Sequence, residues 1–82
     1  MSKSELHDEL KALVADIIEI DDFGDDDNFV TQLGVDSVMA LEIMARIEKN
    51  YHIRVPEDFF AQMKSLNEVV RITTEIMQPV NS

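Results

Sequence analysis

The sequence predicts an all-α fold, a small four-helix bundle of three longer helices and one short helix, with a long loop between the first and second helices. Apolar residues recur at spacings of three and four, which is typical of helices with one buried face. No segment shows the alternating pattern of a strand, and the 82 residues include only two glycines and two prolines. This length fits one domain, and we expect it to span residues 1–82.

The first helix is expected from about Ser4 to Glu19. Its apolar residues fall on one face of a helix. They are Leu6, Leu10, Leu13, Val14, Ile17 and Ile18. The connection that follows, residues 20–36, is long for a compact domain, so we expect its own apolar residues to hold it against the core. These residues are Phe29, Leu33 and Val35.

The second helix is expected to begin around Ser37 and to end near Tyr51, with Asp36 as its N-cap. Its expected apolar face consists of Leu41, Ile43, Met44 and Ile47. Pro56 suits the first position of a short third helix that runs through Met63, because proline lacks the N–H that a helix start leaves unpaired.

The last helix is expected to open with a capping box from Ser65 to Glu68, in which serine and glutamate side chains satisfy free backbone N–H groups. Its expected inward face consists of Leu66, Val69, Val70, Thr73, Ile76 and Met77.

The net charge of the chain favours some classes of binding partner over others. There are 17 acidic residues against seven lysines and arginines, which gives a net charge of −10. Nucleic acid binding is not expected, because it needs a basic surface to displace counterions from phosphates. Partners with basic surfaces are favoured, although acidity alone also serves solubility.

Other sequence features favour a monomeric cytoplasmic protein. The chain has no cysteine, so no disulfide framework of a secreted scaffold is possible. No apolar run approaches the length of a membrane span, and the first residues lack the apolar centre of a signal peptide.

No metal site is expected. Five aspartates surround Gly24, but neither register starting at Asp21 nor one starting at Asp25 satisfies a calcium-binding EF-hand loop. The two histidines, His7 and His52, are far apart and lack zinc-ligand spacing. A solvated acidic loop is the preferred interpretation.

Ser37 stands out because it lies at an expected helix start, shortly after Gly34. A serine in that place often caps a helix, but Asp36 already offers a good cap. A hydrolase motif G-x-S-x-G would need glycine where this chain has Val35 and Met39, and no suitable histidine base accompanies the serine. The sequence therefore does not favour an enzyme.

The run from Leu33 to Glu42, Leu-Gly-Val-Asp-Ser-Val-Met-Ala-Leu-Glu, resembles the attachment motif of acyl carrier proteins, and the resemblance extends over nearly the whole chain. It implies that Ser37 bears 4′-phosphopantetheine, which a phosphopantetheinyl transferase adds from coenzyme A, and that Asp36 orients the attachment turn. The chain has no thiol of its own, so a thioester carrier would need the thiol of this cofactor.

The resemblance also implies a function. A stand-alone acyl carrier protein holds acyl intermediates as thioesters and delivers them to ketosynthases, acyltransferases or other acyl-processing enzymes of polyketide or fatty acid biosynthesis. The partner face is expected at Val38, Met39, Glu42 and Glu48. Five apolar residues are candidates to line a cleft for the acyl chain, although core packing alone also explains each of them. They are Val38, Leu41, Met44, Phe59 and Met63.

The sequence departs from the common motif in two ways, and the second, the charge of the helix, resembles polyketide or other specialised-pathway carriers. Val38 replaces the usual leucine, and residues 37–55 contain two acidic residues against three basic ones, whereas fatty-acid carriers are typically acidic along this helix. Two alternatives remain open: a peptidyl or aminoacyl carrier, which Asp36 disfavours, and a helical adaptor in which Ser37 is only a helix cap.

Overall fold

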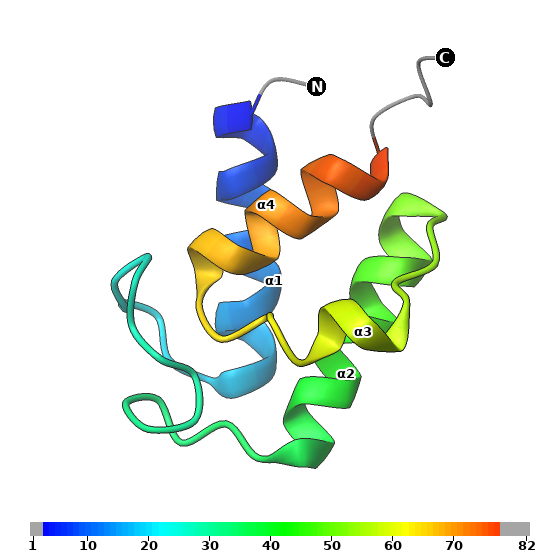
Figure 1. Ribbon diagram of the computed structural model, residues 1–82. Coiled ribbons are helices and arrows are strands. Elements are labelled where there is room, and N and C mark those ends of the chain that lie inside the picture. The colour runs from blue at the N-terminus through cyan, green and yellow to red at the C-terminus, as the bar shows by residue number, and fades with distance from the viewer. Residues whose placement is uncertain (1–2, 78–82) are drawn as a thin grey trace.

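The computed structural model describes residues 3–77 and confirms the all-α fold. Four helices follow one another: α1 (Lys3–Ile18), α2 (Ser37–Tyr51), α3 (Glu57–Phe60) and α4 (Leu66–Met77). No strand is present in this part of the chain. Helix α1 packs against both α2 and α4, the short α3 lies in the connection between α2 and α4, and the long loop between α1 and α2 runs along one side of the bundle (Figure 1).

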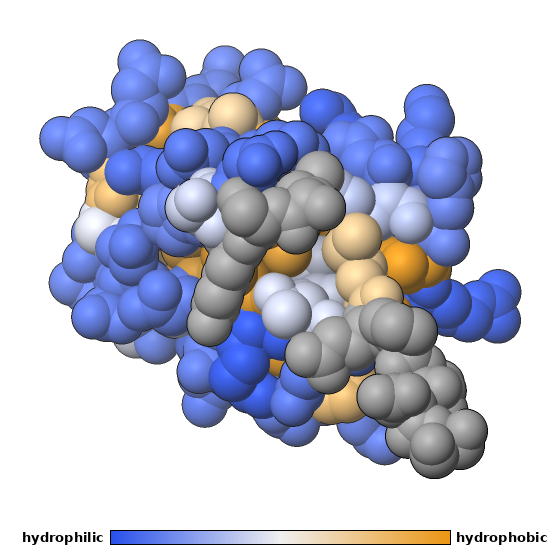
Figure 2. All heavy atoms as spheres, turned by 90° about the horizontal axis from the view of Figure 1, so that it is seen from above, coloured by the Kyte–Doolittle hydropathy of each residue, from blue (hydrophilic) through white to orange (hydrophobic). Residues whose placement is uncertain are grey.

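The buried face of α1 forms the centre of the core, because its apolar residues repeat at helical spacing. Leu10 and Val14 are completely buried, and Ile47 of α2 and Val69 of α4 meet them in the same cluster. Hydrophilic residues cover most of the face shown in Figure 2, as the charge of the sequence leads one to expect.

The third helix is shorter than predicted, since it ends at Phe60 and not at Met63. After it the chain turns: the Gln62 N–H donates to the Phe59 carbonyl, three residues back, and the Lys64 N–H donates to the Gln62 carbonyl. These tight bonds replace the helical pattern and allow the Lys64 carbonyl to accept the N–H of Phe29 at 2.8 Å. The hydrogen bond between the loop and Lys64 thus forms in place of a further turn of α3.

The start and end of α4 differ in detail from the prediction. The Ser65 hydroxyl lies 3.4 Å from the Glu68 N–H, but the Glu68 carboxylate pairs with Arg71 at 2.8 Å, so only half of the predicted capping box is formed. The predicted inward position of Met77 is wrong, because this side chain is 39% exposed in the last turn. Ile72, which the predicted face omitted, is fully buried.

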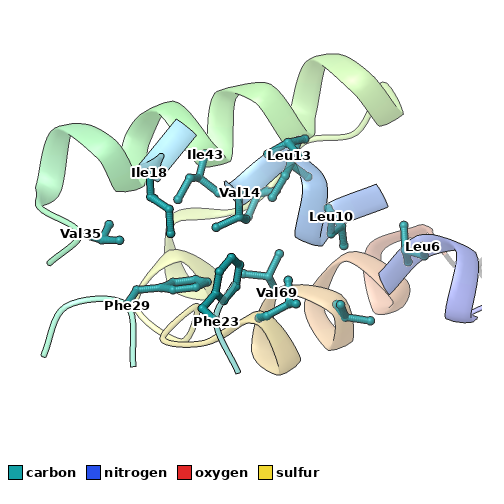
Figure 3. Packing of buried hydrophobic residues seen from close by; sticks show 14 residues of the cluster. Leu6, Leu10, Leu13, Val14, Ile18, Phe23, Phe29, Val35, Ile43 and Val69 are labelled. Atoms are coloured by element: carbon teal, nitrogen blue, oxygen red, sulfur yellow. The ribbon is translucent and has the colours of Figure 1, made fainter. Parts of the chain in front are cut away.

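Three buried side chains hold the long loop, residues 19–36, against the helices. Phe29 and Val35 are buried as predicted, and Phe23 is a third anchor that the prediction missed. Figure 3 shows both phenylalanine rings pointing into the cluster formed by the helices. Leu33 is only partly buried. Burial of each phenylalanine contributes about 1.5–3 kcal/mol, so the loop is fixed through its apolar residues.

Polar contacts hold the acidic part of the same loop. The two ring nitrogens of His7 lie 3.0 Å from Asp25 and 3.1 Å from Asp8, and these hydrogen bonds, the one with Asp25 first, raise the pKa of His7 above 6.5. The Asp25 carbonyl accepts the N–H of Asn67 at 3.0 Å, and the Asn67 side chain donates to Asp26. Part of the acidic cluster therefore has a structural role and is not simply solvated.

Candidate functional site

The Ser37 hydroxyl lies exposed at the first residue of α2, where the loop ends. Asp36 is the N-cap, as predicted: its side chain accepts the Met39 N–H at 2.8 Å. Gly34 has a φ of 69°, a left-handed conformation that glycine adopts at little cost, and Val35 is buried next to it. The turn therefore fixes Asp36 in position, while the Ser37 side chain makes no hydrogen bond with the described part of the chain.

The helix start beside Ser37 is suited to an anion. The Met39 N–H is taken by the Asp36 carboxylate and the Ala40 N–H by the Asp36 carbonyl. The N–H groups of Ser37 and Val38 have no acceptor within residues 3–77. Free N–H groups and the helix dipole both stabilise a negative group at this position, so a phosphate ester on the Ser37 oxygen fits the site.

A cavity of about 400 Å³ opens beside Ser37, between the start of α2 and the turn that follows α3. Most of its lining is apolar. The lining residues are Val30, Val35, Asp36, Ser37, Ala40, Ala61, Met63 and Lys64. An apolar volume next to an exposed hydroxyl can hold part of a chain attached at that hydroxyl.

The predicted cleft residues divide into three groups. Met63 lines the cavity as predicted, whereas Met44 and Phe59 are partly buried against the core. Val38 and Leu41 are 73% and 53% exposed, so their predicted place in a cleft is wrong. The reason is helical geometry: Ile43 and Ile47 point to the core, and Leu41, two positions before Ile43, lies on a different side of α2.

The four residues expected in a partner face lie on different sides of α2. Val38 and Glu42 are exposed on one side, and Met39 is partly buried. Glu48 is also partly buried, and its carboxylate accepts the Val55 N–H at 2.8 Å, which fixes the chain after α2. Glu48 therefore has a structural role that sequence reasoning did not predict.

Sequence reasoning also missed Val30, Ala40, Ala61 and Lys64 as cavity residues. These residues come from three separate segments: the loop before α2, α2 itself and the turn after α3. No periodicity or motif therefore links them. Lys64 is outside every helix, and only the turn after α3 brings it to the cavity.

The fold and the site define a small helical domain that presents an exposed serine hydroxyl at the start of a helix, beside an apolar cavity. Residues 8–72 match the family model described as "Phosphopantetheine attachment site". The chain is 39% identical over 69 residues to polyketide-8 synthase acyl carrier protein 2 of Streptomyces avermitilis, covering 82% of this chain and 79% of that protein. It is 34% identical over 79 residues to an acyl carrier protein of Streptomyces coelicolor, covering 93% and 83%.

A non-reducing polyketide synthase of Aspergillus niger is 32% identical over 63 residues, which are 74% of this chain and 3% of that synthase. The chain therefore belongs to the acyl carrier protein family. It carries acyl intermediates of polyketide or fatty acid synthesis on 4′-phosphopantetheine, and this role implies contacts with acyl-processing enzymes. When bound, the cofactor supplies the thiol that the chain lacks.

Two features of the described residues bear on other classes of site. None of the helices is long and apolar enough to cross a membrane. Within residues 3–77, no three histidine or carboxylate side chains are grouped closely enough to hold a metal ion.

Proposed function

We propose that Ser37 is the attachment residue of the 4′-phosphopantetheine arm. The observation that carries this proposal is the exposed Ser37 hydroxyl, which has no hydrogen-bond partner in the described chain and lies beside a cavity within the matched region. Asp36 positions the serine, because its side chain closes the first turn of α2. The free N–H groups at this turn stabilise the attached phosphate.

Intact mass spectrometry tests the attachment. The apo protein, coenzyme A and a phosphopantetheinyl transferase of broad specificity are combined, and we expect each chain to gain one phosphopantetheine. Ser37→Ala should gain none, while Thr31→Ala, which removes an exposed hydroxyl of the preceding loop, should react like the unaltered protein. Full modification of Ser37→Ala would show that another residue bears the arm.

We further propose that the carrier serves polyketide synthesis, with a ketosynthase and an acyltransferase as partners. The 39% identity to a polyketide-synthase carrier and the excess of basic over acidic residues in residues 37–55 support this choice over fatty acid synthesis. The holo protein should accept a malonyl group from a polyketide acyltransferase with a higher kcat/KM than from a fatty-acid-synthase transferase. The reverse order of the two kcat/KM values would assign it to fatty acid synthesis.

The proposed partner face is the exposed side of α2 next to Ser37. Val38 and Glu42 form its centre and the structure adds Leu41, whereas Met39 and Glu48 are partly buried on other sides of α2 and add only their exposed parts. Exposed apolar side chains beside a carboxylate offer both apolar area and a charge to a basic partner surface.

The remaining expectations are part of the same proposal. The chain itself performs no catalysis: within residues 3–77 the Ser37 hydroxyl makes no hydrogen bond with a histidine or carboxylate that could act as its base, and the Asp36 carboxylate accepts the Met39 N–H instead. It acts as a single monomeric domain in the cytoplasm, where the coenzyme A that donates the arm is present.

A further inference from the structure

The cavity beside Ser37 has one basic residue in its lining, Lys64. This side chain is exposed and makes no ion pair with any carboxylate that the structure describes. Two arginines are paired, since Arg46 lies 3.5 Å from Asp16 and Arg71 pairs with glutamates of its own helix, whereas Lys49 and Arg54 make no ion pair in residues 3–77 but lie outside the cavity lining. Lys11 lies over an aromatic ring. The cavity thus has an ammonium group without an anionic partner.

The position of Lys64 is fixed by its backbone. Its carbonyl accepts the Phe29 N–H at 2.8 Å, its N–H donates to the Gln62 carbonyl at 2.9 Å, and the next residue, Ser65, is buried. Phe29 is itself buried and bonded to the loop that leads to Ser37: its carbonyl accepts the Val35 N–H at 2.7 Å. The base of the Lys64 side chain is therefore held in a defined place relative to Ser37.

Attachment of a phosphodiester at Ser37 places like charges close together. The diester adds a negative charge directly after the Asp36 carboxylate, in a chain whose net charge is already −10. The free N–H groups of the helix start offset part of this charge, but they are dipoles and not a full positive charge. Lys64 is the one full positive charge in the wall of the same cavity.

We propose that the Lys64 ammonium forms an ion pair with the phosphodiester on Ser37 and so directs the first part of the arm over the cavity. The inference rests on the proposed attachment at Ser37. The first part of the arm would then lie next to Ala61 and Met63, which line the same cavity. Lys64 is a positioning residue for the arm.

Phosphorus-31 NMR of the holo protein tests the ion pair, because the phosphodiester on Ser37 contains the single phosphorus atom of the arm. The variants are Lys64→Gln, Lys64→Arg and, as the control, Lys49→Gln. The control removes the same charge from another exposed lysine, at the opposite end of α2 from Ser37. Intact mass is measured first for each protein, so that failure of attachment is distinguished from failure of the ion pair.

At low salt, we expect Lys64→Gln to move the diester resonance by more than its linewidth, whereas Lys64→Arg and Lys49→Gln leave it near the original position. Added salt should move the resonance of the unaltered holo protein toward that of Lys64→Gln, because salt screens exposed ion pairs. A fully loaded Lys64→Gln protein with an unchanged resonance would overturn the inference. So would an equal shift in Lys49→Gln, which would indicate a general effect of net charge.

Discussion

Replacement of Asp36 tests how the start of α2 is stabilised. In Asp36→Ala the Met39 N–H loses its acceptor, which now lies 2.8 Å away, and the helix start loses a nearby negative charge. Loss of an N-cap costs about 0.5–2 kcal/mol, and loss of the favourable dipole interaction about 0.3–1 kcal/mol. We therefore expect a decrease of about 1–2 kcal/mol in the free energy of unfolding. In a domain of this size, each kcal/mol corresponds to about 4–8 °C in Tm.

Urea and thermal unfolding followed by circular dichroism measure this decrease. Asp36→Asn keeps an acceptor of similar capping strength. It should lose only the smaller contribution to stability, the salt-dependent interaction of the charge with the helix dipole. Asp22→Ala is the matched control, since it removes an equal charge from an exposed loop residue for which no hydrogen bond is found among the described residues. The capping argument is refuted if Asp36→Ala is no less stable than Asp22→Ala.

Two further predictions concern stability. The Thr73 hydroxyl is fully buried with no hydrogen-bond partner in residues 3–77, so Thr73→Val should raise the unfolding free energy by about 1 kcal/mol or more, measured by urea unfolding. Thr74→Val is the control: its hydroxyl donates to a carbonyl at 2.7 Å, and equal stabilisation of both variants would contradict the reasoning. The second prediction concerns His7, whose pKa is raised in the folded protein. Its contribution to the free energy of unfolding is therefore complete below pH 6.5 and is lost as pH rises through the folded-state pKa. His7→Gln should therefore remove a decrease in stability toward alkaline pH, and an unchanged pH profile would exclude a role for the Asp25 contact.

The helices could be predicted from the sequence because local patterns specify them. The range Ser37–Tyr51 was predicted with its N-cap, since a capping aspartate and the spacing of Ile43 and Ile47 are both local signals. The end of α3 was not predicted, because it depends on the bond between the Phe29 N–H and the Lys64 carbonyl. Residues far apart in the sequence make that bond, and no short pattern contains it.

The same distinction applies to the site. Asp36 could be predicted as the N-cap, and Ser37 could be proposed as the attachment residue, because the cap and the motif lie within one short segment. The direction of Leu41 was predicted wrongly, because an apolar residue in an amphipathic helix usually faces the core. Its exposure reflects where α1 packs on α2, which is tertiary information. No local sequence pattern predicts a role for Lys64, because only the fold places it beside the cavity.

The burial pattern around Ser37 explains why its position depends on a few local groups. Val35 is buried and Ile43 is the next buried residue, so no side chain between them is buried in the core. Hydrophobic packing is therefore weaker at the start of α2, where only Met39 and Ala40 lie against the core and both are partly buried. The geometry of this helix start depends on the Asp36 cap and on the glycine turn before it. This arrangement leaves the Ser37 hydroxyl exposed, so substitution of Ser37 itself should alter loading with little effect on stability, whereas substitution of Asp36 also destabilises the helix start.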